Sequence, residues 1–255
     1  MKKITKQVKT VKDCKKLQNI NYPFILNMIN YNGDIIPELF AGNENLQFVI
    51  CNGKQKIVGN RAFANCTSLV RFDSVSEVIG KQSFAFCKSL KDFNFLKVNS
   101  LSESSFEFSG LESISLSDKI ERIPKACFRG CLKLKQLYLN NVESIEDDAF
   151  TSCSIQILDL TRSIKFIGKN SFEADIKLSD IICEPFNPPK IYSSTFYGSS
   201  LKNIWFFNEE QMKNYSKNKN WSKYQNLFKL GNSEIIKNRI IEIAEENKKN
   251  ATLFL

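Results

Sequence analysis

A phenylalanine recurs about every 22 residues through most of this 255-residue chain. The residues around it recur as well, as in VIGKQSFAFCKSLKDFNF from Val78 to Phe95 and RIPKACFRGCLKLKQLYL from Arg122 to Leu139. A fixed period of this length indicates that one supersecondary unit has been copied and that each copy packs on its neighbours. The sequence therefore predicts a repeat solenoid. The series is Phe40, Phe63, Phe84, Phe106, Phe128, Phe150, Phe172 and Phe196.

Each unit contains two different periodicities after an Ile/Val-rich entry. Phe128, Cys131 and Leu134 are three residues apart, which places them on one side of a short helix or tight turn. Leu137 and Leu139 then alternate with more polar neighbours, a pattern typical of a short strand with one buried face. Stacked units of this kind form a parallel sheet along one side of the solenoid.

Three of the repeated phrases, IVGNRAFANCTSL, IGKQSFAFCKSL and IPKACFRGCLKL, resemble the BspA-like leucine-rich repeat family. The resemblance covers about Ile35 to Phe207. It implies about eight repeats of roughly 22 residues, with parallel strands on one side, short helices or turns elsewhere, and a cap at each end. It also implies a curved interaction or adhesion module without catalysis or cofactor.

These patterns divide the chain into four segments. We expect an N-terminal cap over residues 1–34, the repeat array over 35–208, an aromatic-rich C-terminal cap over 209–230 and an amphipathic helical tail over 231–255. Ser233 can cap the tail helix, in which Ile236, Ile240 and Ile243 form a stripe. Two interpretations of this stripe stay open, because the helix either docks on the array or is free to bind a partner.

Charge and terminal sequences bear on location and on the class of partner. The formal net charge is +9, but basic and acidic residues balance at 20 each between Leu17 and Asn208. A nucleic-acid partner is therefore not expected, since it would require a basic stripe along the array. We find no signal peptide, membrane span or lipidation motif, and expect a cytoplasmic monomer, with nuclear location or non-classical surface exposure as alternatives.

The cysteines are expected to be structural. Four of the eight, Cys66, Cys87, Cys131 and Cys153, follow a repeat phenylalanine by three residues and should form a buried, reduced ladder. One close pair, Cys127 with Cys131, is a weak zinc signal, and the chain has no histidine. Neither a metal site, a cofactor nor catalysis is therefore expected.

The outward positions of the strands are the expected binding surface, because solenoids present extended concave faces. The preferred function is a non-catalytic protein-binding scaffold. Alternatives are a BspA-like cell-surface adhesin and a phosphatase-regulating repeat protein, the second resting on the repeat period alone. Trp205 has the competing interpretation that it lies under the cap. The candidate contact residues combine aromatic, aliphatic and acidic side chains typical of interface hot spots: Tyr138, Asp159, Asp180, Ile182 and Trp205.

Overall fold

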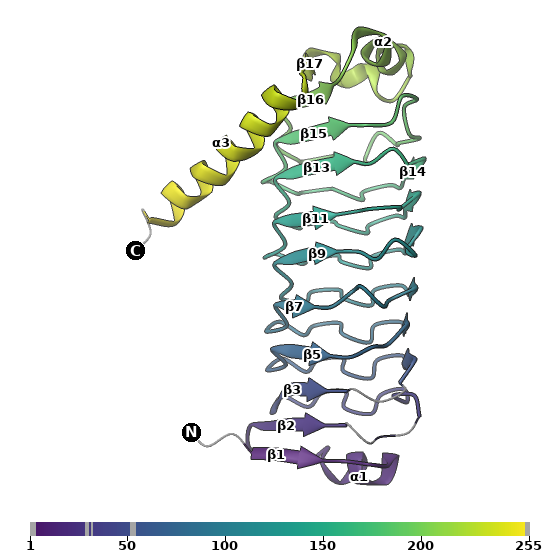
Figure 1. Ribbon diagram of the computed structural model, residues 1–255, viewed down its shortest axis with the longest axis vertical. Coiled ribbons are helices and arrows are strands. Elements are labelled where there is room, and N and C mark those ends of the chain that lie inside the picture. The colour runs from purple at the N-terminus through teal and green to yellow at the C-terminus, as the bar shows by residue number, and fades with distance from the viewer. Residues whose placement is uncertain (1–3, 29–30, 32, 52–54, 253–255) are drawn as a thin grey trace.

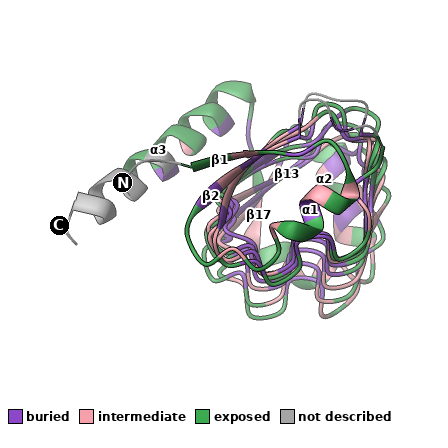
Figure 2. Ribbon diagram, turned by 90° about the horizontal axis from the view of Figure 1, so that it is seen from below, coloured by how far each residue is buried: buried purple, intermediate pink, exposed green. Residues whose placement is uncertain are grey.

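The chain coils into an elongated stack of similar turns, with a helix leaving one end (Figure 1). The computed structural model describes residues 4–28, 31, 33–51 and 55–252. Each turn of the coil carries a short strand on one side, and successive strands lie side by side up the stack (Figure 1). Buried residues gather inside the coil and exposed residues on its outer turns (Figure 2). The predicted repeat solenoid is thereby confirmed.

The longer strands form a parallel ladder in three consecutive pieces, ordered β1-β2-β3-β5-β7, β9-β11 and β13-β15-β16-β17. The register is regular: Asp159 on β13 pairs with Ile182 on β15, which pairs with Trp205 on β16. The strands are β1 (Ile4–Gln7), β2 (Phe24–Asn27), β3 (Leu46–Ile50), β5 (Arg71–Asp73), β7 (Asp92–Phe93), β9 (Ser113–Ser115), β11 (Gln136–Tyr138), β13 (Ile157–Leu160), β15 (Asp180–Cys183), β16 (Asn203–Phe206) and β17 (Phe228–Leu230).

A second parallel ladder follows the Ile/Val-rich entry of each repeat. Its two-residue strands are ordered β4-β6-β8 and β10-β12-β14. In the sequence these positions are too short to show the alternation of a half-buried strand. The strands are β4 (Ile57–Val58), β6 (Val78–Ile79), β8 (Ser100–Leu101), β10 (Arg122–Ile123), β12 (Ser144–Ile145) and β14 (Phe166–Ile167).

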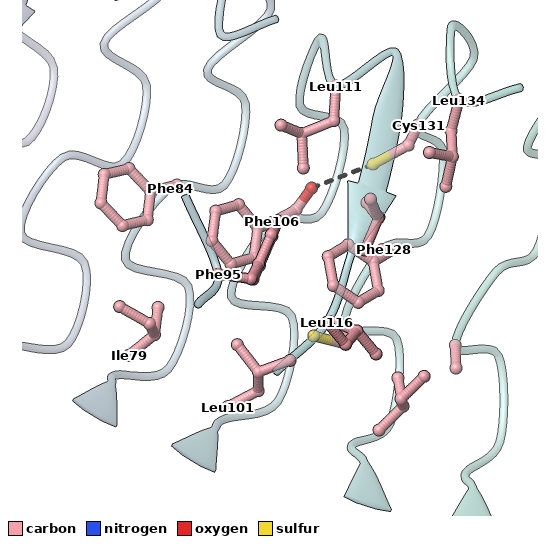
Figure 3. Close-up of a cluster of buried hydrophobic side chains, with 14 of the residues drawn as sticks. Ile79, Phe84, Phe95, Leu101, Phe106, Leu111, Leu116, Phe128, Cys131 and Leu134 are labelled. Atoms are coloured by element: carbon pink, nitrogen blue, oxygen red, sulfur yellow. Dashed lines mark hydrogen bonds between the residues drawn. The ribbon is translucent and has the colours of Figure 1, made fainter. Parts of the chain in front are cut away.

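The recurring phenylalanines form one continuous stack inside the coil. Neighbouring rings lie nearly parallel, with centroids 5.2 to 5.8 Å apart from Phe40 through Phe196. Leucine and isoleucine side chains from both ladders surround the stack, as Figure 3 shows around Phe106 and Phe128. Stacked rings at this distance attract each other and together remove a large apolar area from water.

The position three residues after each stacked phenylalanine, here called the Cys position, is buried from Asn43 through Asp175 and half-buried at Ser199. The Cys131 thiol donates to the Phe106 carbonyl at 3.3 Å (Figure 3), and the Cys153 thiol donates to the Phe128 carbonyl at 3.3 Å. All eight cysteines are free and buried. The predicted inward-facing ladder of thiols is present in the structure, and a small weak donor suits each of these carbonyls.

Backbone hydrogen bonds between successive phenylalanine turns all run in one direction along the array. The N–H of each stacked phenylalanine donates to the carbonyl of the residue just before the next one, as from Phe128 to Ala149 at 2.9 Å and from Phe150 to Ser171 at 2.8 Å. From Phe40 to Phe172, the residue two positions before the phenylalanine has a positive φ, such as Ala126 at 53° and Asp148 at 61°. The same bent backbone therefore recurs in these repeats, and tight turns take the place of short helices.

At the N-terminal end, residues 4–27 extend the longer ladder. β1 and β2 pair in parallel with each other, and β2 pairs with β3. Helix α1 (Val11–Lys16) connects β1 to β2 along the chain. The Gln18 amide donates to the Leu39 carbonyl at 2.7 Å, in the place where a preceding repeat would donate its backbone N–H. The segment therefore closes the first turn with a side chain.

At the C-terminal end, helix α2 (Glu209–Lys217), a 3-10 helix (Ser222–Leu227) and β17 cover the last turn. The Trp221 ring lies 6.0 Å from Phe196 and ends the aromatic stack. Its indole N–H donates to the Pro189 carbonyl at 2.8 Å. Helix α3 (Ser233–Thr252) then leaves the stack beside the longer strands (Figures 1 and 2).

Candidate partner-binding surface

The outward side of β9, β11, β13, β15 and β16 is here called the sheet face, and it carries all five candidate contact residues. Tyr138 is 56% exposed, Asp159 is exposed and Trp205 is half-buried. Asp180 and Ile182 keep only 1% and 5% of their surface. The sequence placed these two at outward strand positions, and they are buried because helix α3 lies over them.

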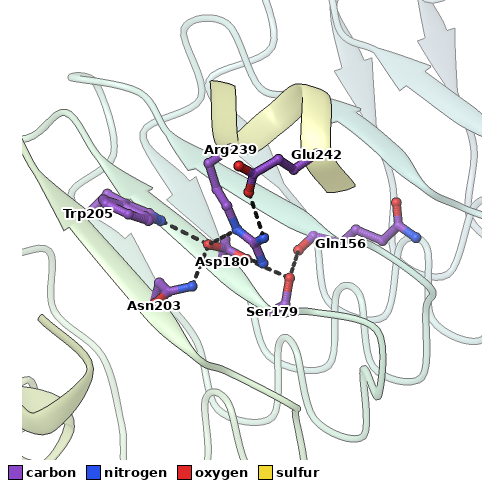
Figure 4. A network of polar contacts seen from close by, with 7 residues as sticks. All are labelled: Gln156, Ser179, Asp180, Asn203, Trp205, Arg239 and Glu242. Atoms are coloured by element: carbon purple, nitrogen blue, oxygen red, sulfur yellow. Dashed lines mark hydrogen bonds and ion pairs between the residues drawn. The ribbon is translucent and has the colours of Figure 1, made fainter. Parts of the chain in front are cut away.

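Asp180 is the centre of a polar network on the sheet face (Figure 4). It accepts hydrogen bonds from the Ser179 hydroxyl at 2.6 Å, the Asn203 amide at 2.9 Å and the Trp205 indole at 2.9 Å. Two guanidinium nitrogens of Arg239, on α3, approach it at 3.3 Å. Burial acts to raise the pKa of Asp180, but these hydrogen bonds outweigh it and lower the pKa.

Helix α3 also contacts the array through part of its apolar stripe. Ile236 and Ile243 are buried at 6% and 5% exposure, whereas Ile240 between them keeps 42%. Gly231, just before the helix, packs so tightly that an added Cβ would lie 3.0 Å from the Trp205 ring. The tail helix therefore docks on the array, which is the first of the two interpretations of its stripe.

The docked helix leaves space on both sides. A cavity of about 820 Å³ opens toward the C-terminal cap and is lined in part by Arg162, Glu184 and Lys237. A cavity of about 400 Å³ opens toward the middle of the array, lined mainly by Leu137, Tyr138, Ile157, Ile240 and Ile243. Asp159, Ile182 and Ile240 line both cavities. The sheet face and α3 thus form one interrupted groove.

Among the described residues, Asp159 is the carboxylate of this groove that no cation pairs with, whereas Glu184 lies 3.9 Å from Arg162. Although the residue is exposed, the walls of the two cavities surround its carboxylate closely enough to raise its pKa to about 6, and the negative charge of Glu184 adds to the effect. Within the described part of the chain, Asp159 forms no ion pair, while Asp180 is paired with Arg239. The groove therefore offers one carboxylate to an incoming cation.

Trp205 is held by contacts from within the protein. Its indole N–H is committed to Asp180, and its ring lies against the start of α3 at Gly231. The competing interpretation placed this residue under the C-terminal cap. The structure places it between β15 and β17, the strand of the cap, and beside the entry to the tail helix, where the residue stays partly exposed.

Sequence reasoning missed the residue that joins the tail to the array. Arg239 is three residues after Ile236 and four before Ile243 and therefore shares their helix face. A lone arginine inside an isoleucine stripe was a signal that the stripe faces a buried carboxylate. Its partner, Asp180, lies 59 positions away, and no repeated pattern links the two.

Among the residues that the structure describes, no group of three or more cysteine, aspartate or glutamate side chains is placed to hold a metal ion. The thiols that might act as ligands or nucleophiles are buried, and burial raises the pKa of Cys66 and Cys131 to about 12. The described helices also include none with the length and apolar character needed to cross a bilayer.

Parallel ladders, inward leucines and a repeating turn of about 22 residues define a leucine-rich repeat protein. The family model for the BspA type leucine rich repeat region (6 copies) matches residues 8–135 and 99–223. These ranges together cover most of the chain, and the protein belongs to this family.

Solved structures show the same likeness, although no curated protein sequence matches the chain. A leucine rich cell surface protein from Faecalibacterium prausnitzii A2-165 is 26% identical with a TM-score of 0.58, covering 62% of this chain and 45% of its own. The present chain thus spans less than half the length of that structure. A leucine-rich repeat protein from Bacteroides ovatus ATCC 8483 is 17% identical with a TM-score of 0.43, covering 71% of this chain and 63% of its own.

Proposed function

We propose that this protein is a non-catalytic scaffold that binds a protein partner on the sheet face. The observation that carries the proposal is the groove between α3 and the strands, where exposed Tyr138 borders an apolar cavity and Asp159 stands beside it without a cation. A tyrosine next to an apolar cavity is typical hot-spot material, because its ring buries a large area while its hydroxyl stays satisfied.

The electrostatics of the array support a protein partner over a nucleic acid. Its 20 basic and 20 acidic residues between Leu17 and Asn208 leave no excess positive charge for a phosphate backbone. The lining of the groove balances Asp159 and Glu184 against Arg162 and Lys237, and Glu184 pairs with Arg162, so Asp159 is the carboxylate left to favour a basic residue. We expect the partner to present an apolar anchor with a cation next to it.

The test is capture of protein partners by a chain that carries Tyr138→Ala together with Asp159→Lys. We expect the pair to lose partners that the native chain retains, because a central interface aromatic is worth about 2 kcal/mol or more and the new charge is repulsive to a cation. Tyr197→Ala with Asp118→Lys is a matched control, since both residues are exposed away from the groove. Equal losses in the two variants, or none in either, would contradict binding at the sheet face.

An adhesin is the second candidate, favoured by the cell-surface protein to which the chain is 26% identical. In that case the partner is a host or matrix protein and the chain reaches the cell exterior. The scaffold proposal instead assigns a monomer to the cytoplasm. Fractionation of the native cell separates the two, because protease added to intact cells degrades an exposed adhesin and spares a cytoplasmic scaffold.

A further inference from the structure

The sheet face holds a binding site for a cation, the Asp180 carboxylate, here called the receptor. The residues that orient this carboxylate belong to the array itself. Ser179, Asn203 and Trp205 all donate to the Asp180 carboxylate, at 2.6 to 2.9 Å, and all three belong to the strands and turns of the array. The contacts from Arg239 are longer, at 3.3 Å. The carboxylate therefore keeps its orientation whether or not α3 supplies the arginine (Figure 4).

Helix α3 places Arg239 on Asp180 but fills the rest of the groove incompletely. Ile236 and Ile243 are buried, whereas Ile240, which lines both cavities, keeps 42% of its surface. The cavities of about 820 and 400 Å³ lie on either side of the helix, and both reach Ile182 beneath it. A helix with bulkier apolar side chains in the same place would cover more apolar surface than α3 does.

The contacts of α3 are also suited to release. Arg239 pairs with Glu242 on its own helix at 3.2 Å, so its guanidinium keeps an anionic partner when it leaves Asp180. The helix is joined to β17 through Gly231 and Asn232. A short connection with a glycine can redirect the helix without disturbing the strands of the array.

We propose that α3 occupies the partner's own site, and that the partner is an amphipathic helix whose arginine replaces Arg239 on Asp180. This inference rests on the proposed function and names its partner class. The replacing helix places aliphatic residues around the arginine as Ile236, Ile240 and Ile243 do. Its better fit fills the cavity beside Tyr138, and a second basic residue meets Asp159.

A synthetic peptide with the sequence of residues 233–252, labelled with fluorescein, tests the inference on the full chain. In the native protein the tethered helix competes at a high effective concentration, so the peptide binds weakly. Arg239→Ala weakens the tethered helix and leaves the receptor intact, and we expect this protein to bind the peptide at least about tenfold more tightly. Lys217→Ala is the matched control, because it removes a positive charge from an exposed position of helix α2 that lines neither cavity.

Two further arms locate the site. A peptide with alanine in place of its arginine should bind Arg239→Ala protein about tenfold more weakly, and the native peptide should lose similar affinity when Asp180→Asn is added. The peptide arm leaves the protein unchanged, so it is independent of any folding defect caused by Asp180→Asn. Equal peptide affinity for native and Arg239→Ala protein, or indifference to the peptide's arginine, overturns the inference.

The oligomeric state tests the remaining alternative, in which α3 of one copy docks on a second copy of the chain. A native protein that is a dimer, and becomes a monomer on Arg239→Ala, would exchange α3 between copies, which overturns displacement by a foreign helix. Failure here leaves partner capture through Tyr138 and Asp159 intact, because that assay measures binding of cellular proteins in the presence of native α3. The opposite result is also distinguishable. If the peptide binds tightly but the Tyr138 and Asp159 substitutions capture the same proteins as their control pair, the proposed function is wrong and the inference about α3 is not.

Discussion

Asp175 is the one carboxylate at the Cys position, and its replacement should stabilise the array. Its side chain is fully buried, with one oxygen accepting from the Ile155 N–H at 3.2 Å and the other without a hydrogen-bond partner among the described residues. Burial raises the pKa of Asp175 to about 7, although the N–H groups of Ile155 and Lys177 act to lower it. The folded protein therefore binds this proton more tightly than the unfolded chain does.

The magnitude follows from the two pKa values. The ordinary value is 3.8 and the folded value about 7, and each pH unit between them corresponds to about 1.36 kcal/mol. Ionisation thus costs the folded state on the order of 4 kcal/mol above pH 7. Because the pKa is raised for an acid, this cost is absent below about pH 4 and grows as the pH rises toward 7.

Asp175→Asn removes the titration while keeping the shape. The chain already contains this solution, since Asn43 occupies the Cys position of the first repeat with 5% exposure. Its amide oxygen accepts from the N–H groups of Asn45 and Leu46, and its NH₂ donates to the carbonyls of Leu17 and Gln18. We expect the amide at position 175 to be satisfied in the same way.

Urea denaturation at pH 5, 6, 7 and 8 measures the effect. The variant should avoid a cost of about 1.5 kcal/mol at pH 5 and on the order of 4 kcal/mol at pH 8, so the difference between the two proteins grows with pH. Groups that titrate in both proteins cancel in this difference. Asp118→Asn, at an exposed carboxylate, is the matched control for the substitution itself. A stability difference for Asp175→Asn that is the same at pH 5 and pH 8 would refute the reasoning.

Two further predictions concern the core. Phe128→Ala should cost roughly 3 to 5 kcal/mol by urea denaturation, because the ring stacks on both neighbours, and Phe40→Ala should cost less, because Phe40 begins the stack. Equal losses would contradict a stack held by nearest neighbours. The Cys66 and Cys131 thiols should react with a thiol reagent far more slowly in the native state than in denaturant, since both are buried and burial raises each pKa to about 12. Equal rates in the two states would place them at the surface.

The interior could be predicted from the sequence because every inward position is repeated. Phe128, Cys131 and Leu134 recur at fixed spacing, so each repeat supports the assignment made from the others. The strand register followed for the same reason, and it correctly aligned Asp159 with Ile182 and Trp205. Periodicity is informative wherever packing against identical neighbours decides the structure.

The candidate site was harder, because its contacts occur once. Tyr138 and Asp159 lie exposed as expected, but Asp180 and Ile182 are covered by a helix outside the repeats. Arg239 and Asp180 are 59 residues apart, and their contact depends on the direction in which α3 leaves β17. No local propensity or period encodes that direction.

The one-way hydrogen bonds of the phenylalanine turn give the array a head and a tail. From Phe40 to Phe172, these phenylalanine N–H groups point to the next repeat, and the carbonyls that accept them point back. The head of the array therefore exposes an acceptor, which Gln18 satisfies. A unit duplicated in the middle meets a complementary surface above and below, and the chemistry of both ends is unchanged. Length is thus free to vary by gene duplication, whereas two arrays can be joined only head to tail.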